Sequence, residues 1–309
     1  MAEAPQTSGP MIFDRALVRR HRRRAEALGP ATFLLDRVAA DLAERLAAVL
    51  RRFAVAVDLG TPGGAVRAAL AGLGSIGTIV AADVMREWGA MRAEGTQNFV
   101  VADEEALPFR DASLDLVVSA LALQFVNDLP GVLVQIRCAL KADGLLLAAF
   151  VGGETLTELR QAFAAAESDI EGGASPRVAP FVEVRALGDL LQRAGFALPV
   201  TDSDRYTVRY DSPFELMHEL RRMGATNALL ARRRTPLKRA TLLRMAEIYA
   251  QRFADPDGRV RATFEILWLS GWAPHPSQQQ PLRPGSAKAR LADALNAREI
   301  SAGEKAARR

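Results

Sequence analysis

A glycine-rich turn between a strand and a helix is the first feature of this sequence that could do chemistry. The segment VAVDLGTPGG occupies residues 55–64. Its strand ends at Asp58, the chain turns through Gly60, and a helix begins at Gly63–Gly64. Glycine lets a backbone approach a ligand closely, and the N-terminus of a helix presents free N–H groups to a carboxylate. A tight turn without a ligand has the same pattern, so this turn alone does not define a site.

Acidic residues follow at the ends of the next two expected strands. Asp83 ends the second strand, 25 residues after Asp58, where an acid accepts hydrogen bonds from both hydroxyls of a ribose. Asp103 and Glu104 end the third strand in DEEALPF, residues 103–109, where a carboxylate can accept the exocyclic amine of adenine. Each acid alone fits a solvated loop or a helix cap. Glycines and acids at three successive strand ends together predict a nucleotide site at one edge of a sheet.

Strands and helices that alternate along the chain must position these residues. Alternation of this kind predicts a parallel sheet that is covered by helices on both faces. We expect strands at residues 54–59, 78–83, 99–101, 114–119, 145–150, 205–210 and 259–269. We expect helices at residues 64–73, 84–93, 129–140, 155–168, 184–194, 212–224 and 236–253.

Two helical segments are expected outside the alternating pattern, one before the first strand and one between the last two strands. Residues 11–52 have apolar positions at helical spacing. Ser212 is an N-cap followed by proline, and Glu215 stands three residues after it, which predicts the start of a helix. Together with the helix expected at 236–253, it forms a pair inserted between the last strands, which we expect to be a lid over the sheet. The expected organisation is a helical segment at 1–52, a ligand-binding α/β domain at 53–211, the lid at 212–255, the last strand at 256–278 and a flexible tail at 279–309.

Composition argues against several other kinds of site. The one cysteine, Cys138, excludes an internal disulfide and a thiolate zinc cage. None of the three histidines, His21, His218 and His275, has an acidic residue two positions on, so no two-histidine, one-carboxylate iron site is visible. We therefore expect no metal. No run approaches 18 apolar residues and the first ten residues lack an apolar stretch, which predicts a cytoplasmic protein without a transmembrane segment.

The basic residues are almost all arginine and are clustered. The net charge is +4, and arginines gather at 19–24, 221–222 and 232–234. A basic face could meet an acidic protein, RNA or anionic lipid, whereas the plainer interpretation is a set of solvated helix faces. Aromatic residues do not interleave with these clusters, so we expect no nucleic-acid partner.

The motifs resemble those of a known enzyme family. DLGTPGG, AADV, DEEALPF and LDLVVSALALQFVNDLPGVL resemble the class I S-adenosylmethionine-dependent methyltransferases. Within that family the chain is similar to the biotin-pathway malonyl-carrier-protein methyltransferase and to the respiratory complex I assembly factor 5. Four downstream phrases favour the assembly factor and its alphaproteobacterial relatives: FDRALVRRHR (13–22), GGETLTELRQAF (152–163), SPFELMHELRRMGATNAL (212–229) and SGWAPHPSQQQPLRPGSA (270–287). The fold implied is a Rossmann-like methyltransferase sheet with an N-terminal helical segment and an inserted helical lid.

The resemblance implies a role for particular residues. It assigns the methionine part of S-adenosylmethionine to four of them, Asp58, Gly60, Thr61 and Gly64. It places the ribose on Asp83, the adenine between Asp103 and Glu104, and Ser119 in the wall of the site, although Ser119 is equally an ordinary strand-end cap. Pro62 departs from the pattern: it stands where the family has its middle glycine, and proline donates no N–H.

The resemblance also implies a reaction and a partner. Methyl transfer needs mainly a positioned nucleophile and excluded water, without a metal. Assembly-factor relatives are implicated instead in hydroxylating an arginine of a quinone-module subunit of complex I, which requires an oxidant. Methylation, hydroxylation and a non-catalytic assembly role all stay open, as does methylation of an acyl-carrier-bound or other small carboxylate. Glu154 and Glu158, one helical turn apart, are candidates to grip an arginine side chain, or acids that favour a helix N-terminus. Peripheral association with the inner face of the respiratory membrane fits this interpretation.

Overall fold

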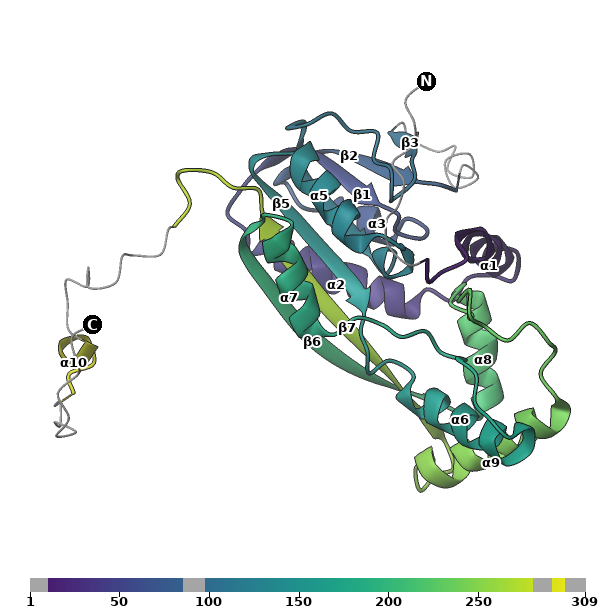
Figure 1. Cartoon of the computed structure of the whole chain (residues 1–309). Helices are drawn as coiled ribbons and strands as arrows, with labels where there is room; N and C mark the ends of the chain where they lie inside the picture. Colours follow the sequence, from purple (N-terminus) through teal and green to yellow (C-terminus); the bar gives the residue numbers. More distant parts are fainter. Residues whose placement is uncertain (1–10, 86–97, 280–290, 298–309) are drawn as a thin grey trace, which may run out of the picture. The chain divides into compact units, whose positions relative to one another are not determined.

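A seven-stranded sheet lies at the centre of the larger of two structural units, Met1–Pro274 and His275–Arg309. The computed structural model describes residues 11–85, 98–279 and 291–297. The strand order is β3-β2-β1-β4-β5-β7-β6 (Figure 1), in which β3 to β5 are parallel while β7 is antiparallel to both its neighbours. The strands are β1 (Phe53–Leu59), β2 (Ile76–Asp83), β3 (Phe99–Val101), β4 (Leu114–Ala120), β5 (Leu140–Val151), β6 (Ala197–Tyr210) and β7 (Val260–Trp272).

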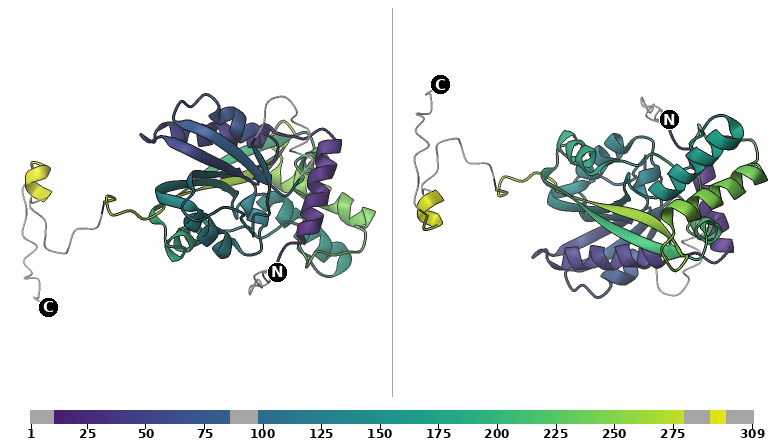
Figure 2. Two further views of the ribbon diagram at one scale, coloured as in Figure 1. Left: turned by 90° about the horizontal axis from the view of Figure 1, so that it is seen from above. Right: turned by 90° about the horizontal axis from the view of Figure 1, so that it is seen from below.

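Helices lie on both sides of this sheet, as the two views of Figure 2 show. In the described part of the chain they are α1 (Arg15–Ala27), α2 (Phe33–Ala47), α3 (Ala65–Leu70), α5 (Leu129–Ala139), α6 (Thr157–Glu171), α7 (Val184–Arg193), α8 (Pro213–Arg222), α9 (Arg239–Phe253) and the short α10 (Leu291–Ala294) of the smaller unit. A short 3-10 turn, η1 (Leu123–Phe125), follows β4.

The apolar side chains of the strands alternate between two cores. Leu116 and Val118 of β4 pack in a core with α2, α3, α6, α8 and α9, whereas Val117 packs in a second core with α5 and α7. Successive residues of a strand point to opposite faces, so a strand that is buried on both sides must be apolar throughout. The run LLLAAFV meets this requirement, and LDLVVSA meets it except at Asp115 and Ser119. The predicted parallel sheet with two covered faces is confirmed for β1 to β5, whereas β7 is antiparallel to its neighbours.

The two longest neighbouring strands extend past the rest of the sheet. β6 and β7 pair from Ala197–Trp272 to Tyr210–Val260, but β5 pairs with β7 only as far as Ile266. Val260 and Phe264, in the part of β7 beyond β5, are buried against the core of α6, α8 and α9. This projecting ribbon therefore carries the inserted helical pair, with α8 against α1 and α9 against α6.

Most expected elements match observed ones within a few residues, and two strands are longer than expected. β5 begins at Leu140, not at 145, and β6 begins at Ala197, not at 205. The helix expected at 84–93 falls largely on residues 86–97, which lie outside the described residues.

A buried carboxylate fixes the connection that follows α6. Glu167, fully buried, accepts hydrogen bonds from the backbone N–H of Ser175 at 2.6 Å and from Nε of Arg177 at 2.7 Å. Burial raises the pKa of Glu167, but the bonds from Ser175 and Arg177 outweigh it and hold the pKa below its ordinary value. The same connection continues to Phe181, which lines the cavity described below.

Glu167→Ala should lower the free energy of unfolding by about 3 kcal/mol, because breaking a buried ion pair leaves a guanidinium without its counter-charge. Urea unfolding at pH 7 measures this change in the free energy of unfolding. Asp169→Asn is the control, because Asp169 lies on the same helix as Glu167 but makes an exposed ion pair, with Arg244 of α9. This substitution should change stability by less than about 0.5 kcal/mol. A lowered pKa stabilises the fold above the ordinary glutamate pKa, so the Glu167 difference should shrink as acid protonates that group. Equal losses in the two variants would contradict the assignment.

Candidate cofactor site and adjoining cavity

The acids that follow successive strands meet at one edge of the sheet. β1 and β2 are paired up to Leu59 and Ala82, and Asp83 ends β2 opposite Val101 of β3. Parallel neighbours end at the same edge, so Asp58, Asp83 and the acids after β3 are brought together. The charges of Asp58 and of Glu104 each raise the pKa of Asp83, which reflects how close the three lie.

The turn after β1 is packed against the acid that follows β3. Gly60 has a φ of +68°, and a Cβ on it would lie 3.0 Å from Oε1 of Glu104 and 3.1 Å from Cβ of Ala122. A residue with a side chain would therefore be strained in its backbone and crowded by its neighbours. The next residue, Thr61, is buried, and its hydroxyl accepts the backbone N–H of Ala120 at 2.9 Å, which ties the turn to the end of β4.

Asp58 is a buried carboxylate that is only partly satisfied. Its Oδ1 atom has no hydrogen-bond partner within the described ranges, and its other oxygen lies 3.8 Å from Nε of Arg67. Burial raises the pKa of Asp58 to about 7, against the opposing effects of the Thr61 hydroxyl and the Arg67 charge. A ligand that donates hydrogen bonds here would relieve this cost.

Asp83 is in a similar state. One oxygen accepts the backbone N–H of Met85 at 2.6 Å, while Oδ2 is buried and has no hydrogen-bond partner among the described residues. The nearest cation is Arg22, whose guanidinium lies 3.6 Å from Oδ2. Burial raises the pKa of Asp83 to about 7, although Arg22 and the Met85 N–H act in the opposite direction.

Two arginines of α1 close over these acids. Arg15 pairs with Asp103, with Glu104 and, at 3.0 Å, with Glu105, and Arg22 lies 3.7 Å from Glu104. Arg22 is only 7% exposed. The sequence analysis placed Arg22 in a basic cluster, either a partner-binding face or a solvated helix face, and connected neither arginine with the cofactor site. The available signal was their spacing, because seven residues is two helical turns and puts both on one face of α1 with the buried Val18.

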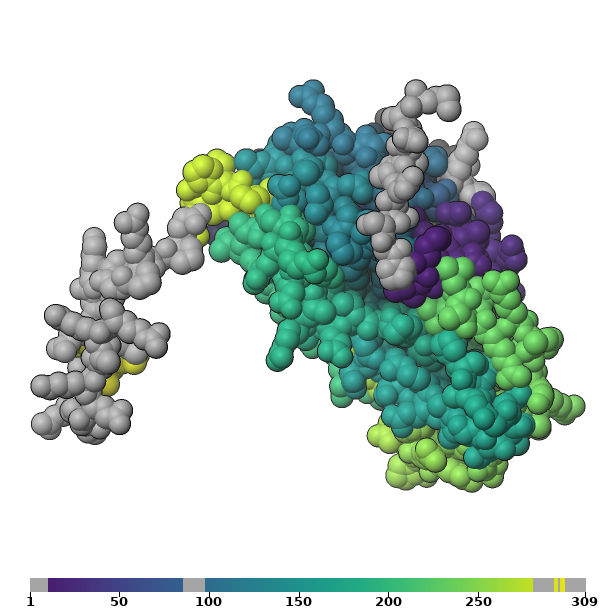
Figure 3. All heavy atoms as spheres, in the orientation of Figure 1, coloured from purple at the N-terminus to yellow at the C-terminus, as the bar shows by residue number. Residues whose placement is uncertain are grey.

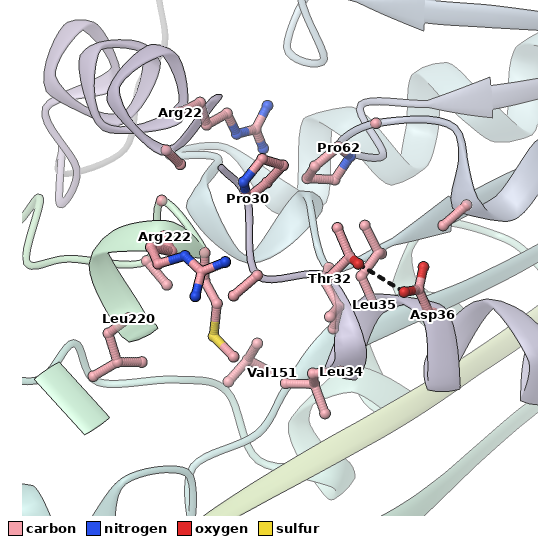
Figure 4. A pocket seen from close by; sticks show the side chains of 18 of the residues that line it. Arg22, Pro30, Thr32, Leu34, Leu35, Asp36, Pro62, Val151, Leu220 and Arg222 are labelled. Carbon is pink, nitrogen blue, oxygen red and sulfur yellow. Dashed lines mark hydrogen bonds between the residues drawn. The ribbon is translucent and has the colours of Figure 1, made fainter. Parts of the chain in front are cut away.

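A cavity of about 560 Å³ adjoins the glycine turn (Figure 4). Its walls come from the α1–α2 connection, the turn after β1, the segment after β5, Phe181 and the end of α8. Pro62 and Gly64 line it from the turn, and Leu220 and Met223 line it from α8. Figure 3 shows the purple surface of α1 lying against the green surface of α8, where the backbone N–H of Ala31 donates to the carbonyl of Arg222 at 3.1 Å. The cofactor turn and the end of α8 thus line one cavity.

Three residues expected near the site have other partners. Ser119 is fully buried, and its hydroxyl donates to the carbonyl of Leu59 at 2.7 Å. Glu158 is buried against β7, where it accepts the N–H of Thr263 at 3.1 Å. Glu154 is exposed and pairs with Arg205 at 3.4 Å. None of these three side chains lines the cavity, and of the expected cofactor residues only Gly64 does. The acids Asp58, Asp83 and Glu104 meet instead at the adjoining sheet edge. The two expected substrate acids, Glu154 and Glu158, lie in neither place.

S-adenosylmethionine carries the hydrogen-bond donors that the buried carboxylates of this site need. The cofactor has an ammonium group and two ribose hydroxyls, and the site has two buried carboxylate oxygens, on Asp58 and Asp83, without hydrogen bonds in the described structure. The positive φ of Gly60 lets the turn pack directly against Glu104 and Ala122 beside these acids. Among the residues that the structure describes, no three His, Cys, Asp or Glu side chains are grouped to hold a metal ion. The residues present fit the cofactor that the motifs imply.

Comparison with known proteins gives the same family over most of the chain. Residues 57–148 match the family model for a methyltransferase domain. The chain is 38% identical over 299 residues to the mitochondrial arginine-hydroxylase NDUFAF5 of Danio rerio, covering 92% of this chain and 90% of that protein. The human protein of that name is 40% identical over 281 residues, or 89% and 81% of the two chains. A malonyl-[acyl-carrier protein] O-methyltransferase of Xylella fastidiosa is 40% identical over 175 residues, or 57% of each chain.

Solved structures agree on the fold. A Bacillus halodurans protein assigned as a methyltransferase superposes with a TM-score of 0.53 at 18% identity, covering 76% of this chain and 99% of that one. The YcgJ protein of Bacillus subtilis gives 0.52 at 14% identity, covering 77% and 99%. The expected Rossmann-like methyltransferase sheet is confirmed, and the chain belongs to the family of the arginine-hydroxylase NDUFAF5.

Proposed function

We propose that this chain is an S-adenosylmethionine-binding enzyme that modifies an arginine side chain of a quinone-module subunit during assembly of respiratory complex I. The observation that carries the proposal is similarity to arginine-hydroxylases along 81% to 90% of the length of the human and Danio rerio proteins. A malonyl-carrier methyltransferase matches only 57% of the chain, which favours the arginine-modifying role.

The residues of the site have separable tasks in this proposal. Asp83 holds the ribose, Asp58 and the turn at Gly60 hold the methionine end, and Glu104 frames the adenine. When bound, S-adenosylmethionine supplies an electrophilic methyl group. Apolar walls from α8 and from Phe181 exclude water from the space beside the turn. Ser119 supports the ends of β1 and β4 through its bond to Leu59. A lid role for residues 212–255 stays a prediction.

The partner and its location follow from the same proposal. Complex I subunits are assembled at the respiratory membrane, and we place the protein at its inner face as a peripheral component. The arginines of α1 that point away from the sheet, such as Arg20 and Arg24, are exposed and offer a basic surface there. No helix among the described residues is long and apolar enough to span a membrane.

The mass of the quinone-module subunit tests the proposed function. Subunit from cells that carry the gene should be heavier than subunit from deletion cells at one arginine-containing peptide. A difference of about 16 Da identifies hydroxylation and about 14 Da identifies methylation, since these are the masses of one added oxygen and one added CH₂. Identical masses in the two strains would overturn an enzymatic role and leave assembly without modification.

Asp83→Ala should weaken S-adenosylmethionine binding by about 2 kcal/mol, or about thirtyfold in Kd, because two ribose hydroxyls lose a charged acceptor. Isothermal calorimetry at pH 8 measures it, with circular dichroism to confirm the fold. The matched control is Glu154→Gln, which also removes a carboxylate but at an exposed position outside the cavity. An unchanged Kd for folded Asp83→Ala protein would refute the ribose assignment.

Cofactor affinity should depend on pH near neutrality. The pKa values of Asp58 and Asp83 are both raised to about 7, and the cofactor's donors bind the ionised carboxylates. Below pH 7 these groups take up protons that binding must displace, so Kd should rise by about tenfold between pH 8 and pH 6 for each group involved. Calorimetry at both pH values measures the change, which should be smaller in Asp83→Ala. A Kd that is constant over this range would contradict the raised pKa values.

A further inference from the structure

The inner face of α1 brings a carboxylate into the cavity beside the cofactor turn. Glu26 stands one helical turn after Arg22 and lines the same cavity as Pro62 and Gly64. It lies in the last turn of α1, where the helix dipole disfavours a negative charge. The helix itself therefore gains nothing from an acid at this position.

The other charged groups of the cavity are already paired. Arg22 faces Asp83 and Glu104. Asp36 accepts the hydroxyl of Thr32 at 2.7 Å, the dashed line of Figure 4. Arg222 donates from Nε to the carbonyl of Gly29 at 2.7 Å.

Glu26 differs from these groups. Within the described ranges, its carboxylate makes no hydrogen bond or ion pair, and burial raises its pKa. A half-buried carboxylate beside an apolar wall is a poor neighbour for an anion and a good one for a cation.

A second acceptor lines the same space. Gln124 belongs to η1, directly after β4, and its side-chain oxygen is buried with no hydrogen-bond partner among the described residues. Gln124 and Glu26 come from different elements, yet both line this cavity, together with the apolar Leu35 and Phe264. Unmatched acceptors beside apolar walls suit a ligand with several N–H donors, a positive charge and an aliphatic stem.

From this arrangement we infer that Glu26, assisted by Gln124, receives the guanidinium of the target arginine side chain beside the cofactor turn. The inference rests on the proposed function and deepens it, because it names the group that selects arginine. Glu26 acts as a specificity-determining residue: its carboxylate accepts the N–H donors of the guanidinium, while the apolar walls cover the methylene stem. An acidic substrate such as a malonyl group would meet a like charge at this position.

Binding of two small probes tests the inference directly. N-acetyl-L-arginine methylamide has the guanidinium, and N-acetyl-L-citrulline methylamide replaces it with a neutral urea of nearly the same shape. NMR titration of the full chain saturated with S-adenosylmethionine should give a Kd for the arginine probe about tenfold lower than for the citrulline probe. Glu26→Gln should remove that preference, and Glu26→Asp should restore part of it.

The controls separate this inference from a folding defect and from the proposed function. Asp36→Asn changes a carboxylate of the same cavity that is already paired with Thr32, and it should keep the preference. The Kd for S-adenosylmethionine should be unchanged in Glu26→Gln. Equal binding of both probes to wild type, or a preference that survives Glu26→Gln, overturns the inference. Unmodified subunit in wild-type cells, with the probe preference intact, overturns the proposed function instead.

Discussion

The need to neutralise several carboxylates at one sheet edge governs how this protein is assembled. Asp58, Asp83 and Glu104 are all buried within a few residues of strand ends. Such a group of acids is costly to desolvate unless cations approach it. Arg67 supplies one from α3, and Arg15 and Arg22 supply the rest from α1. The N-terminal helix is thus held over the cofactor site by the ion pairs of Arg15 and Arg22 together with the packing of its buried Val18 and Ala25.

The same constraint explains why the site and the cavity are continuous. Once α1 is fixed over the acids, its connection to α2 lies beside the glycine turn, and both line the cavity. The end of α8 packs against that connection, and Arg222 donates to the carbonyl of Gly29. Two segments about 200 residues apart in sequence therefore lie side by side, and together with the cofactor turn they line one cavity.

The sequence predicted those parts of the fold and of the site that depend on patterns of neighbouring residues. Apolar runs such as LDLVVSA mark buried strands, and acids directly after such runs must lie at the sheet edge. β6 was predicted too short because TDSD at 201–204 looks like a turn, although these residues pair with β7 along its outer edge. Arg15, Arg22, Glu26 and Gln124 were not predicted, because their significance depends on partners far along the chain or on a cavity.

The ends of the inserted helical pair are direct neighbours in the sheet. Tyr210 of β6 is paired with Val260 of β7, so the 49 residues between them leave and re-enter the fold at one point. An insertion anchored in this way can diverge, lengthen or be replaced without moving a single strand of the nucleotide-binding sheet. Changes in the insertion, and in the cavity wall that the end of α8 supplies, can therefore accumulate independently of changes in the turns that follow β1, β2 and β3.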